Sequence, residues 1–141
     1  MPVVTFHLLD NEATHQHAEA LLKGACALYA EVLEAPIERI RAFITLHRPE
    51  HFLVHGELCS TNGIHSPFFD FIIMNGRPIE KHHRLMAGFT DLLVHTLGVE
   101  RSAVRGICRR VEAEDWCISG EPASVVRKAE VDARAAAAAK A

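Results

Sequence analysis

The 141-residue sequence lacks several features that would place it in a specialised class of protein. No apolar run approaches the roughly 18 residues of a membrane span, and no charged segment followed by an apolar one indicates a signal peptide at the N-terminus. The net charge is only −3, which argues against nucleic-acid binding through bulk electrostatics. Because 49% of the residues are apolar and 23% are charged, we expect one globular domain that needs neither a metal nor a disulfide to fold.

The cysteines and histidines show no metal-binding pattern. None of the cysteines forms a CxxC pair; they are Cys26, Cys59, Cys108 and Cys117. A zinc site would usually need two close Cys/His pairs, and adjacent histidines such as His82 and His83 do not share a helix face. We therefore expect reduced thiols in a cytoplasmic protein, with no metal and no other cofactor.

An internal repeat organises the chain. One constant offset matches four pairs of residues: Leu33 with Leu97, Ile40 with Val104, Arg41 with Arg105, and Phe52 with Trp116. Self-similarity at a fixed offset indicates a repeated supersecondary unit. We expect two units, at about residues 2–62 and 67–127, joined by a turn-rich linker into a single domain over residues 1–128.

Each unit is expected to fold as strand, helix and strand. Runs of branched apolar residues predict strands at 3–9, 40–46, 68–74 and 104–111. Apolar residues recur at helical spacing from Leu21 to Leu33 and from Leu85 to Leu97, which predicts one helix in each unit. Thr14 is expected to cap the first helix and Pro36 to end it.

The remaining segments are predicted from their turn-forming residues and their composition. Residues 51–60, with Gly56, are expected to form a hairpin or loop, and residues 117–124 a turn-rich end. The alanine-rich tail at residues 129–141 is expected to be a frayed helix or disordered, and no function is assigned to it.

The predicted fold class is α/β (α+β). A β-α-β unit within one sheet has parallel strands and a right-handed crossover. Two tandem units then give a four-stranded mixed sheet with both helices on one face and a pseudo-twofold repeat. Apolar strand residues are expected on the other face too: Phe6, Leu8, Ile44, Phe69 and Phe71. Covering that face by symmetric association is the natural solution, so we expect a ring-shaped oligomer.

Short motifs follow one another in a characteristic order. They are Met1-Pro2, Glu34-Ala35-Pro36, His51-Phe52, Gly56-Glu57-Leu58, Asn75-Gly76-Arg77, Asp115-Trp116 and Gly120-Glu121-Pro122. In this order they resemble the tautomerase superfamily, most closely the 4-oxalocrotonate tautomerase group, over roughly residues 2–127. Long members with fused repeats, such as cis-3-chloroacrylic acid dehalogenase and malonate semialdehyde decarboxylase, form trimers. The resemblance therefore implies a homotrimer.

The N-terminal proline of this family is a base, and the chemistry of the residue explains why. Removal of Met1 would leave Pro2 with a free secondary amine. An α-amino group titrates near neutral pH, and burial beside arginines disfavours its protonated form and lowers its pKa. Such a base can transfer a proton between a carbon and a carbonyl oxygen. The alternative is that Pro2 only begins an edge strand, where its missing N–H is harmless.

Arginines supply the cations that such a reaction needs. Their forked donors and permanent charge suit a carboxylate and a developing enolate oxygen. Arg77 is expected between a strand end and a helix start, and the resemblance matches it to the family arginine that binds the substrate carboxylate. Arg41 and Arg105 match a second family arginine, contributed by a neighbouring unit. Phe52 and Trp116 match an aromatic wall of the pocket. Solvated arginines and core aromatics are the alternatives for these four residues.

The two units differ at the expected site. Glu12 stands in the first unit where the second has Arg77. Pro67 matches Pro2 but lies in mid-chain, where its nitrogen is an amide and cannot act as a base. We therefore expect one active site per chain, combining Pro2 with Arg77. Tyr29 lies where the cis-dehalogenase group carries a histidine, so it either touches the pocket or packs in the core.

The leading hypothesis is a cofactor-free tautomerase or isomerase that acts on a small 2-keto or enol carboxylate with Pro2 as general base. A hydrolytic dehalogenase or decarboxylase that uses protonated Pro2 as an acid is an alternative, with Glu38 as a weak candidate for the decarboxylase aspartate. A non-catalytic trimeric interaction protein is a third. The expected partners are a small carboxylate and two further copies of the chain, with no nucleic acid and no membrane.

Overall fold

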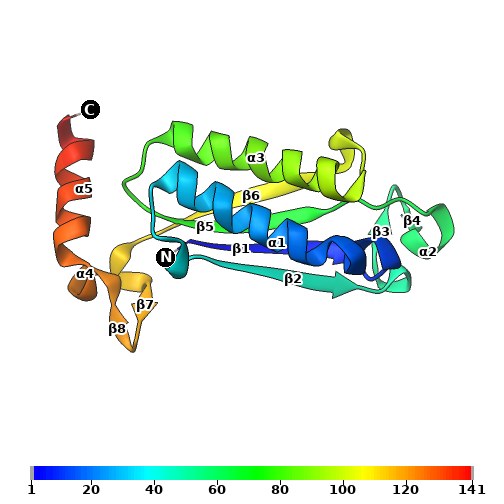
Figure 1. Ribbon diagram of the computed structural model, residues 1–141, viewed down its shortest axis with the longest axis horizontal. Coiled ribbons are helices and arrows are strands. Elements are labelled where there is room, and N and C mark those ends of the chain that lie inside the picture. The colour runs from blue at the N-terminus through cyan, green and yellow to red at the C-terminus, as the bar shows by residue number, and fades with distance from the viewer. Residues whose placement is uncertain (1, 141) are drawn as a thin grey trace.

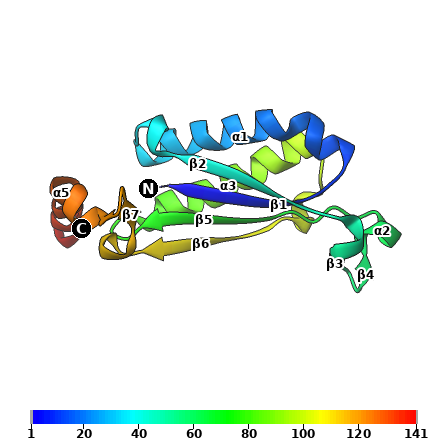
Figure 2. The same cartoon turned by 90° about the horizontal axis from the view of Figure 1, so that it is seen from below.

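The computed structural model describes residues 2–140, in which four strands form one sheet and two long helices lie on one of its faces (Figures 1 and 2). Met1, whose removal the sequence predicts, and Ala141, at the end of the expected tail, lie outside the described residues. Within this range no helix combines the length and the apolar character that crossing a membrane requires.

The two halves of the chain have the same order of elements. The first contains β1 (Val3–Leu9), α1 (Glu12–Leu33), β2 (Arg41–His47), β3 (Leu53–Val54), β4 (Glu57–Leu58) and α2 (Cys59–Asn62). The second contains β5 (Phe68–Met74), α3 (Ile79–Leu97), β6 (Arg105–Val111), β7 (Cys117–Ile118), β8 (Glu121–Pro122) and α4 (Ala123–Val126). Helix α5 (Lys128–Lys140) follows at the C-terminus. Short 3-10 turns cover Ile37–Arg39, Pro49–His51, Arg101–Ala103 and Ala113–Asp115.

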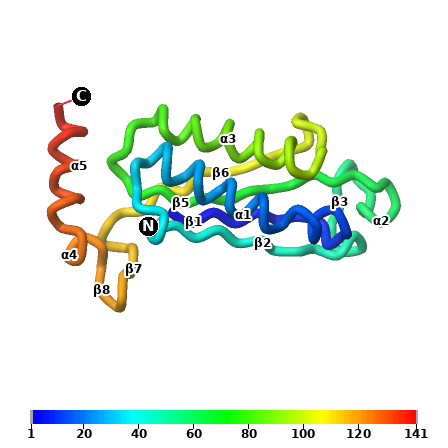
Figure 3. Tube along the Cα trace, viewed as in Figure 1, coloured from blue at the N-terminus to red at the C-terminus, as the bar shows by residue number. Residues whose placement is uncertain are grey.

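The sheet topology confirms the predicted pair of β-α-β units. The strand order is β2-β1-β5-β6. Strands are parallel within each unit, and β1 is antiparallel to β5 where the units meet. The repeat extends to single hydrogen bonds: Arg41 N donates to Pro2 O and Arg105 N donates to Pro67 O, both at 3.1 Å. The Cα trace shows α1 and α3 side by side over the sheet (Figure 3).

The antiparallel pairing of β1 with β5 decides which residues meet at each end of the sheet. Val3 lies opposite Ile72, so the start of β1 lies beside the end of β5. The loop that leaves β5 carries Arg77. Pro2 from the first unit and Arg77 from the second therefore lie at the same end of the sheet.

The hydrophobic core lies between the sheet and the two helices. Alternate residues of the central strands point toward α1 and α3, and Phe89 of α3 makes edge-to-face contacts with Phe6, Tyr29 and Phe71. The expectation of apolar side chains on the uncovered face is wrong for the residues on which it rested. Phe6, Leu8, Ile44, Phe69 and Phe71 all belong to the core or pack against it.

Two local predictions also need correction. The side chain that caps α1 is Asn11, whose Oδ1 accepts from Thr14 N at 2.8 Å, whereas Thr14 itself is buried. Helix α1 ends at Leu33, and Glu34 adopts the left-handed conformation with φ 53°. Pro36 thus follows the helix end and does not cause it. Of the two states expected for the tail, a helix or disorder, the structure shows a helix, α5.

Candidate active site

Pro2 is a buried residue at the start of β1. Its carbonyl oxygen accepts from Arg41 N at 3.1 Å, which fixes the first residue of the strand against β2. Its neighbour Val3 pairs with Ile72, near the end of β5. Both parts of the sheet therefore hold the N-terminal residue in one place, among the elements that also carry Arg77.

Arg77 lies in the loop between β5 and α3, and its side chain reaches the end of α1. Its Nη1 donates to Leu33 O at 3.0 Å, one of the carbonyls that a helix leaves without an internal partner at its C-terminus. Burial, and then the nearby Arg134 cation, lower the pKa of Arg77 to about 10, against opposing effects of Glu130 and Glu34. The guanidinium remains a cation at neutral pH.

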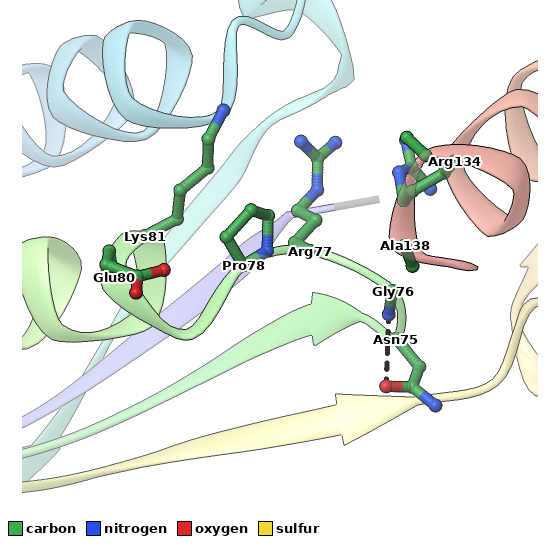
Figure 4. A pocket seen from close by; sticks show the side chains of 9 residues that line it. Asn75, Gly76, Arg77, Pro78, Glu80, Lys81, Arg134 and Ala138 are labelled. Carbon is green, nitrogen blue, oxygen red and sulfur yellow. Dashed lines mark hydrogen bonds between the residues drawn. The ribbon is translucent and has the colours of Figure 1, made fainter. Parts of the chain in front are cut away.

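A cavity of about 520 Å³ opens beside Arg77. Its lining consists of Asn75, Gly76, Arg77, Pro78, Glu80, Lys81, Arg134, Ala137 and Ala138. Figure 4 shows Arg77 and Arg134 reaching the same space, Arg77 from the β5–α3 loop and Arg134 from α5. Three cationic side chains against one carboxylate make this cavity suitable for a small anion. Pro2 lies at this end of the sheet but is not among the residues that line the cavity.

The two arginines matched by the repeat lie at opposite ends of the sheet. Arg41 is exposed at the start of β2, opposite Val3, and so lies at the end that holds Pro2. Arg105 lies at the start of β6, opposite Phe68. Its guanidinium donates to the carbonyls of Ser102 and Val104. Within one chain, only Arg41 of this pair shares an end with Pro2.

The two aromatic residues are separated in the same way. Phe52 lines a hollow together with Pro67 and Arg105. Trp116 follows β6 and precedes β7, which Figure 1 places at the end where the chain begins. Its indole nitrogen is buried and has no hydrogen-bond partner within residues 2–140. Of the two aromatics, Trp116 is the one at the end that holds Pro2.

The end of the sheet that holds Pro67 also has a cavity. It measures about 620 Å³ and includes Asn11, His55, His65 and Arg105 in its lining. Asn11 is the repeat counterpart of Gly76, so the two cavities occupy equivalent places in the two units. The proline at this end is Pro67, whose nitrogen belongs to a peptide bond; a single active site per chain stays a prediction.

Tyr29 is fully buried in the core. Its hydroxyl donates to Ile72 O at 2.6 Å and lies 3.1 Å from Val3 O. Burial raises the pKa of this phenol, so the hydroxyl stays a donor at neutral pH. The structure shows the core role that the sequence left open, and contact between Tyr29 and a substrate stays a prediction.

Sequence reasoning missed Arg134. The alanine-rich tail that carries Arg134 was expected to be a frayed helix or disordered and was assigned no function. The available signal was helical spacing of charged residues, since Glu130 and Arg134 lie one turn apart and so share a face. Within residues 2–140, no group of three or more His, Cys, Asp or Glu side chains is placed to hold a metal ion.

Comparison with known proteins finds relatives of one unit and of the whole chain. A family model described as "Tautomerase enzyme" matches residues 2–62. A probable tautomerase of Ralstonia nicotianae is 32% identical over 69 residues, which cover 49% of this chain and 99% of the relative. A 2-hydroxymuconate tautomerase of Pseudomonas fluorescens is 35% identical over 60 residues, covering 43% of this chain and 94% of the relative.

Solved structures resemble both units together. Native fused 4-OT superimposes with a TM-score of 0.80 at 20% identity, covering 89% of this chain and 98% of the other. A fused 4-OT described as a symmetric trimer gives a TM-score of 0.76 at 20% identity, covering 88% of this chain and 98% of the other. Short relatives that match about half of the chain, and fused ones that match most of it, agree with the two-unit architecture.

Proposed function

The chain belongs to the tautomerase family, and from this membership we propose that it is an isomerase that interconverts the enol and keto forms of a small 2-keto carboxylate, with Pro2 as the general base. The observation that carries the proposal is that a buried Pro2 and a half-buried, cationic Arg77 lie at one end of the sheet, where a cavity opens beside Arg77.

The chemistry requires a base, a cation and a dry site. The ring nitrogen of Pro2, free after removal of Met1, takes the proton of the enol hydroxyl. As the oxygen becomes a carbonyl, the electrons of the C=C bond take the proton back from the ring nitrogen at carbon. Arg77 binds the carboxylate of the substrate and stabilises negative charge that develops on the oxygen. Burial of an amine and nearby cations both favour its unprotonated, basic form, which is the form that the proposal requires of Pro2 at neutral pH.

The charge of the cavity supports an anionic substrate. Arg77, Lys81 and Arg134 line it together with Glu80. Lys81 also lies 3.5 Å from Glu34 at the end of α1. The similar 2-hydroxymuconate tautomerase acts, by its name, on an enol that carries carboxylates. A small enol carboxylate is therefore the substrate class that the cavity suits best.

Ketonisation of phenylenolpyruvate tests the proposal. Compared with wild type, Pro2→Ala should lower kcat/KM about 100-fold or more, because it removes the secondary amine that acts as base. Arg77→Ala should lower it about 100-fold, because a half-buried, charged donor to the developing negative charge is lost. Arg84→Ala is the matched control, since Arg84 is an exposed arginine of α3, and it should leave the rate unchanged.

Two outcomes would contradict the proposal. One is a Pro2→Ala variant that is as active as wild type, with mass spectrometry showing that Met1 is removed from both. The other is hydrolysis of a 3-haloacrylate by an enzyme that does not ketonise phenylenolpyruvate, which would favour the dehalogenase alternative.

We also propose that the chain forms a homotrimer through the face of the sheet that its own helices leave uncovered. The fused 4-OT relatives that superimpose on it include proteins described as trimers. Figure 2 shows both long helices on one side of the sheet and no element of comparable length on the other. Burial of apolar residues on that open face supplies the driving force for association.

A further inference from the structure

Helix α5 lies across the end of the molecule that holds Pro2 and Arg77 (Figure 1). Four of its residues follow helical spacing and so share one face: Glu130, Arg134, Ala137 and Ala138. Three of them, Arg134, Ala137 and Ala138, line the cavity beside Arg77. The alanine-rich tail is thus a wall of the candidate active site.

An ion pair with the body of the protein holds this helix. Glu130 accepts from both terminal nitrogens of Arg39, at 3.0 and 3.2 Å. Arg39 belongs to the turn that follows α1, which is the helix whose end accepts from Arg77. A two-point contact between a guanidinium and a carboxylate fixes orientation as well as distance. The pair therefore sets which face of α5 meets the cavity.

Arg134 packs closely against the loop that carries Arg77. A Cβ added at Gly76 would lie 3.3 Å from both Cγ and Cδ of Arg134. Gly76 also has φ 103°, a conformation that side chains rarely adopt. Glycine at this position thus permits both the turn after β5 and the approach of the Arg134 side chain.

Arg134 forms no direct salt bridge in the part of the chain that the structure describes, although its charge acts on the Glu130 carboxylate one turn away. Within residues 2–140 the ion pairs of α5 involve Glu130, Lys128 and Asp132, and none involves Arg134. Its charge also repels Arg77, whose pKa it helps burial to lower. The Glu130 carboxylate is engaged by Arg39, so two cations that face one cavity are stabilised further when a carboxylate binds between them.

We propose that Arg134 of helix α5 binds the substrate carboxylate together with Arg77, so that the C-terminal helix sets the affinity of the enzyme for its anionic substrate. This inference rests on the proposed function, because it assigns Arg134 to the same site. Arg134 lines the cavity, and the carboxylate that it would bind keeps its charge during the reaction, so the contact should be equal in the ground state and in the transition state. Its loss should then raise KM and leave kcat nearly unchanged.

Steady-state kinetics with phenylenolpyruvate test the inference in the full-length protein. Arg134→Ala should raise KM about tenfold, as expected for one charge-assisted contact in a half-buried position, with kcat within about twofold of wild type. Arg134→Lys should recover part of the loss, because it keeps the charge but not the fork of donors. Lys128→Ala is the matched control on the same helix, since Lys128 pairs with Asp132 and does not line the cavity. It should leave KM unchanged.

A binding measurement separates this inference from the proposed function. Calorimetric titration with phenylpyruvate, the keto product, reports carboxylate binding without turnover. If Pro2→Ala is as active as wild type, the proposed function fails, while the titration still compares Arg134→Ala with Lys128→Ala. Weaker binding by Arg134→Ala alone supports the role of α5. Equal KM values and equal affinities for these two variants would overturn it.

Discussion

Tyr29 connects the two units through a single hydroxyl. The side chain comes from α1, and its oxygen contacts the main-chain carbonyls of Ile72 in β5 and Val3 in β1. Val3 follows Pro2 directly, so this contact also fixes the backbone beside the proposed base. The residue that the family resemblance suggested for the pocket thus supports the pocket from the core side.

Replacing Tyr29 with phenylalanine removes the hydroxyl and keeps the ring. We expect Tyr29→Phe to lower the free energy of unfolding by about 1–2 kcal/mol, because buried carbonyl groups lose a donor. Urea denaturation at fixed protein concentration measures the change, and the slope of the transition should stay constant. The KM for phenylenolpyruvate should not change. A raised KM with unchanged stability would instead show that the hydroxyl touches the substrate.

The two long helices end in equivalent ways but with different residues. Gly98 caps α3 with φ 67°, and its N–H donates to Val94 O. Glu34 caps α1 with φ 53°, and its N–H donates to Ala30 O. A left-handed conformation is easy for glycine and unfavourable for glutamate. The first unit therefore carries strain at a position where the second has none.

This difference predicts opposite effects of exchanging the two residues. Glu34→Gly should raise the free energy of unfolding by about 0.5–1 kcal/mol, because it removes the strain at a cost in unfolded-chain entropy. The exposed pair with Lys81, at 3.5 Å, contributes little to set against this gain. Gly98→Ala should lower the free energy by about 1 kcal/mol. Thermal unfolding of both variants measures the shifts, and a destabilised Glu34→Gly would contradict the strain argument.

Helix α5 is held in place by an ion pair and not by the packing of an apolar face. It has no buried residue, and its fixed position depends on the pair between Arg39 and Glu130, which are 91 residues apart in sequence. Exposed ion pairs contribute little free energy. Substitutions that remove α5 contacts should therefore affect the cavity more than the stability of the fold.

At the scale of the whole molecule, one face of the sheet is not covered by the helices of the chain. Three apolar side chains are exposed there, Phe43 at 51%, Phe68 at 37% and Ile107 at 39%. Between them, Arg109 Nε donates to both carboxylate oxygens of Asp70 at 2.9 Å. Apolar residues around a satisfied polar pair are typical of a surface that a protein partner covers.

A charge on this face should prevent association. We expect light scattering to give wild type a mass of three times 15.6 kDa and Phe43→Asp a mass closer to one chain, because burial of an unpaired carboxylate is costly. Ile79→Asp is the control, since Ile79 is 49% exposed but lies on α3, at the other side of the sheet. A monomeric wild type, or a Phe43→Asp variant that stays trimeric, would contradict the proposed interface.

Local patterns in the sequence were sufficient to predict the two β-α-β units. Strand and helix periodicity can be recognised from a few neighbouring residues, and the same strand-helix-strand pattern occurs in both units. The positions of β1 and β5 were predicted without error, and the motifs around Pro2 and Arg77 indicated the family. Cap positions were less predictable. Asn11 and Thr14 are both suitable caps, and only the path of the chain at the helix start selects between them.

By itself, the sequence determined the secondary structure, the duplication and the residue types for acid–base chemistry, since these depend on neighbours along the chain. Only the tertiary structure decided that Arg41 and not Arg105 shares an end with Pro2 within one chain, because antiparallel pairing of β1 with β5 reverses the second unit. Only the tertiary structure placed Arg134 in the same cavity as Arg77. The position of α5 depends on the contact between Arg39 and Glu130, and no periodic pattern in the sequence predicts a contact between residues so far apart.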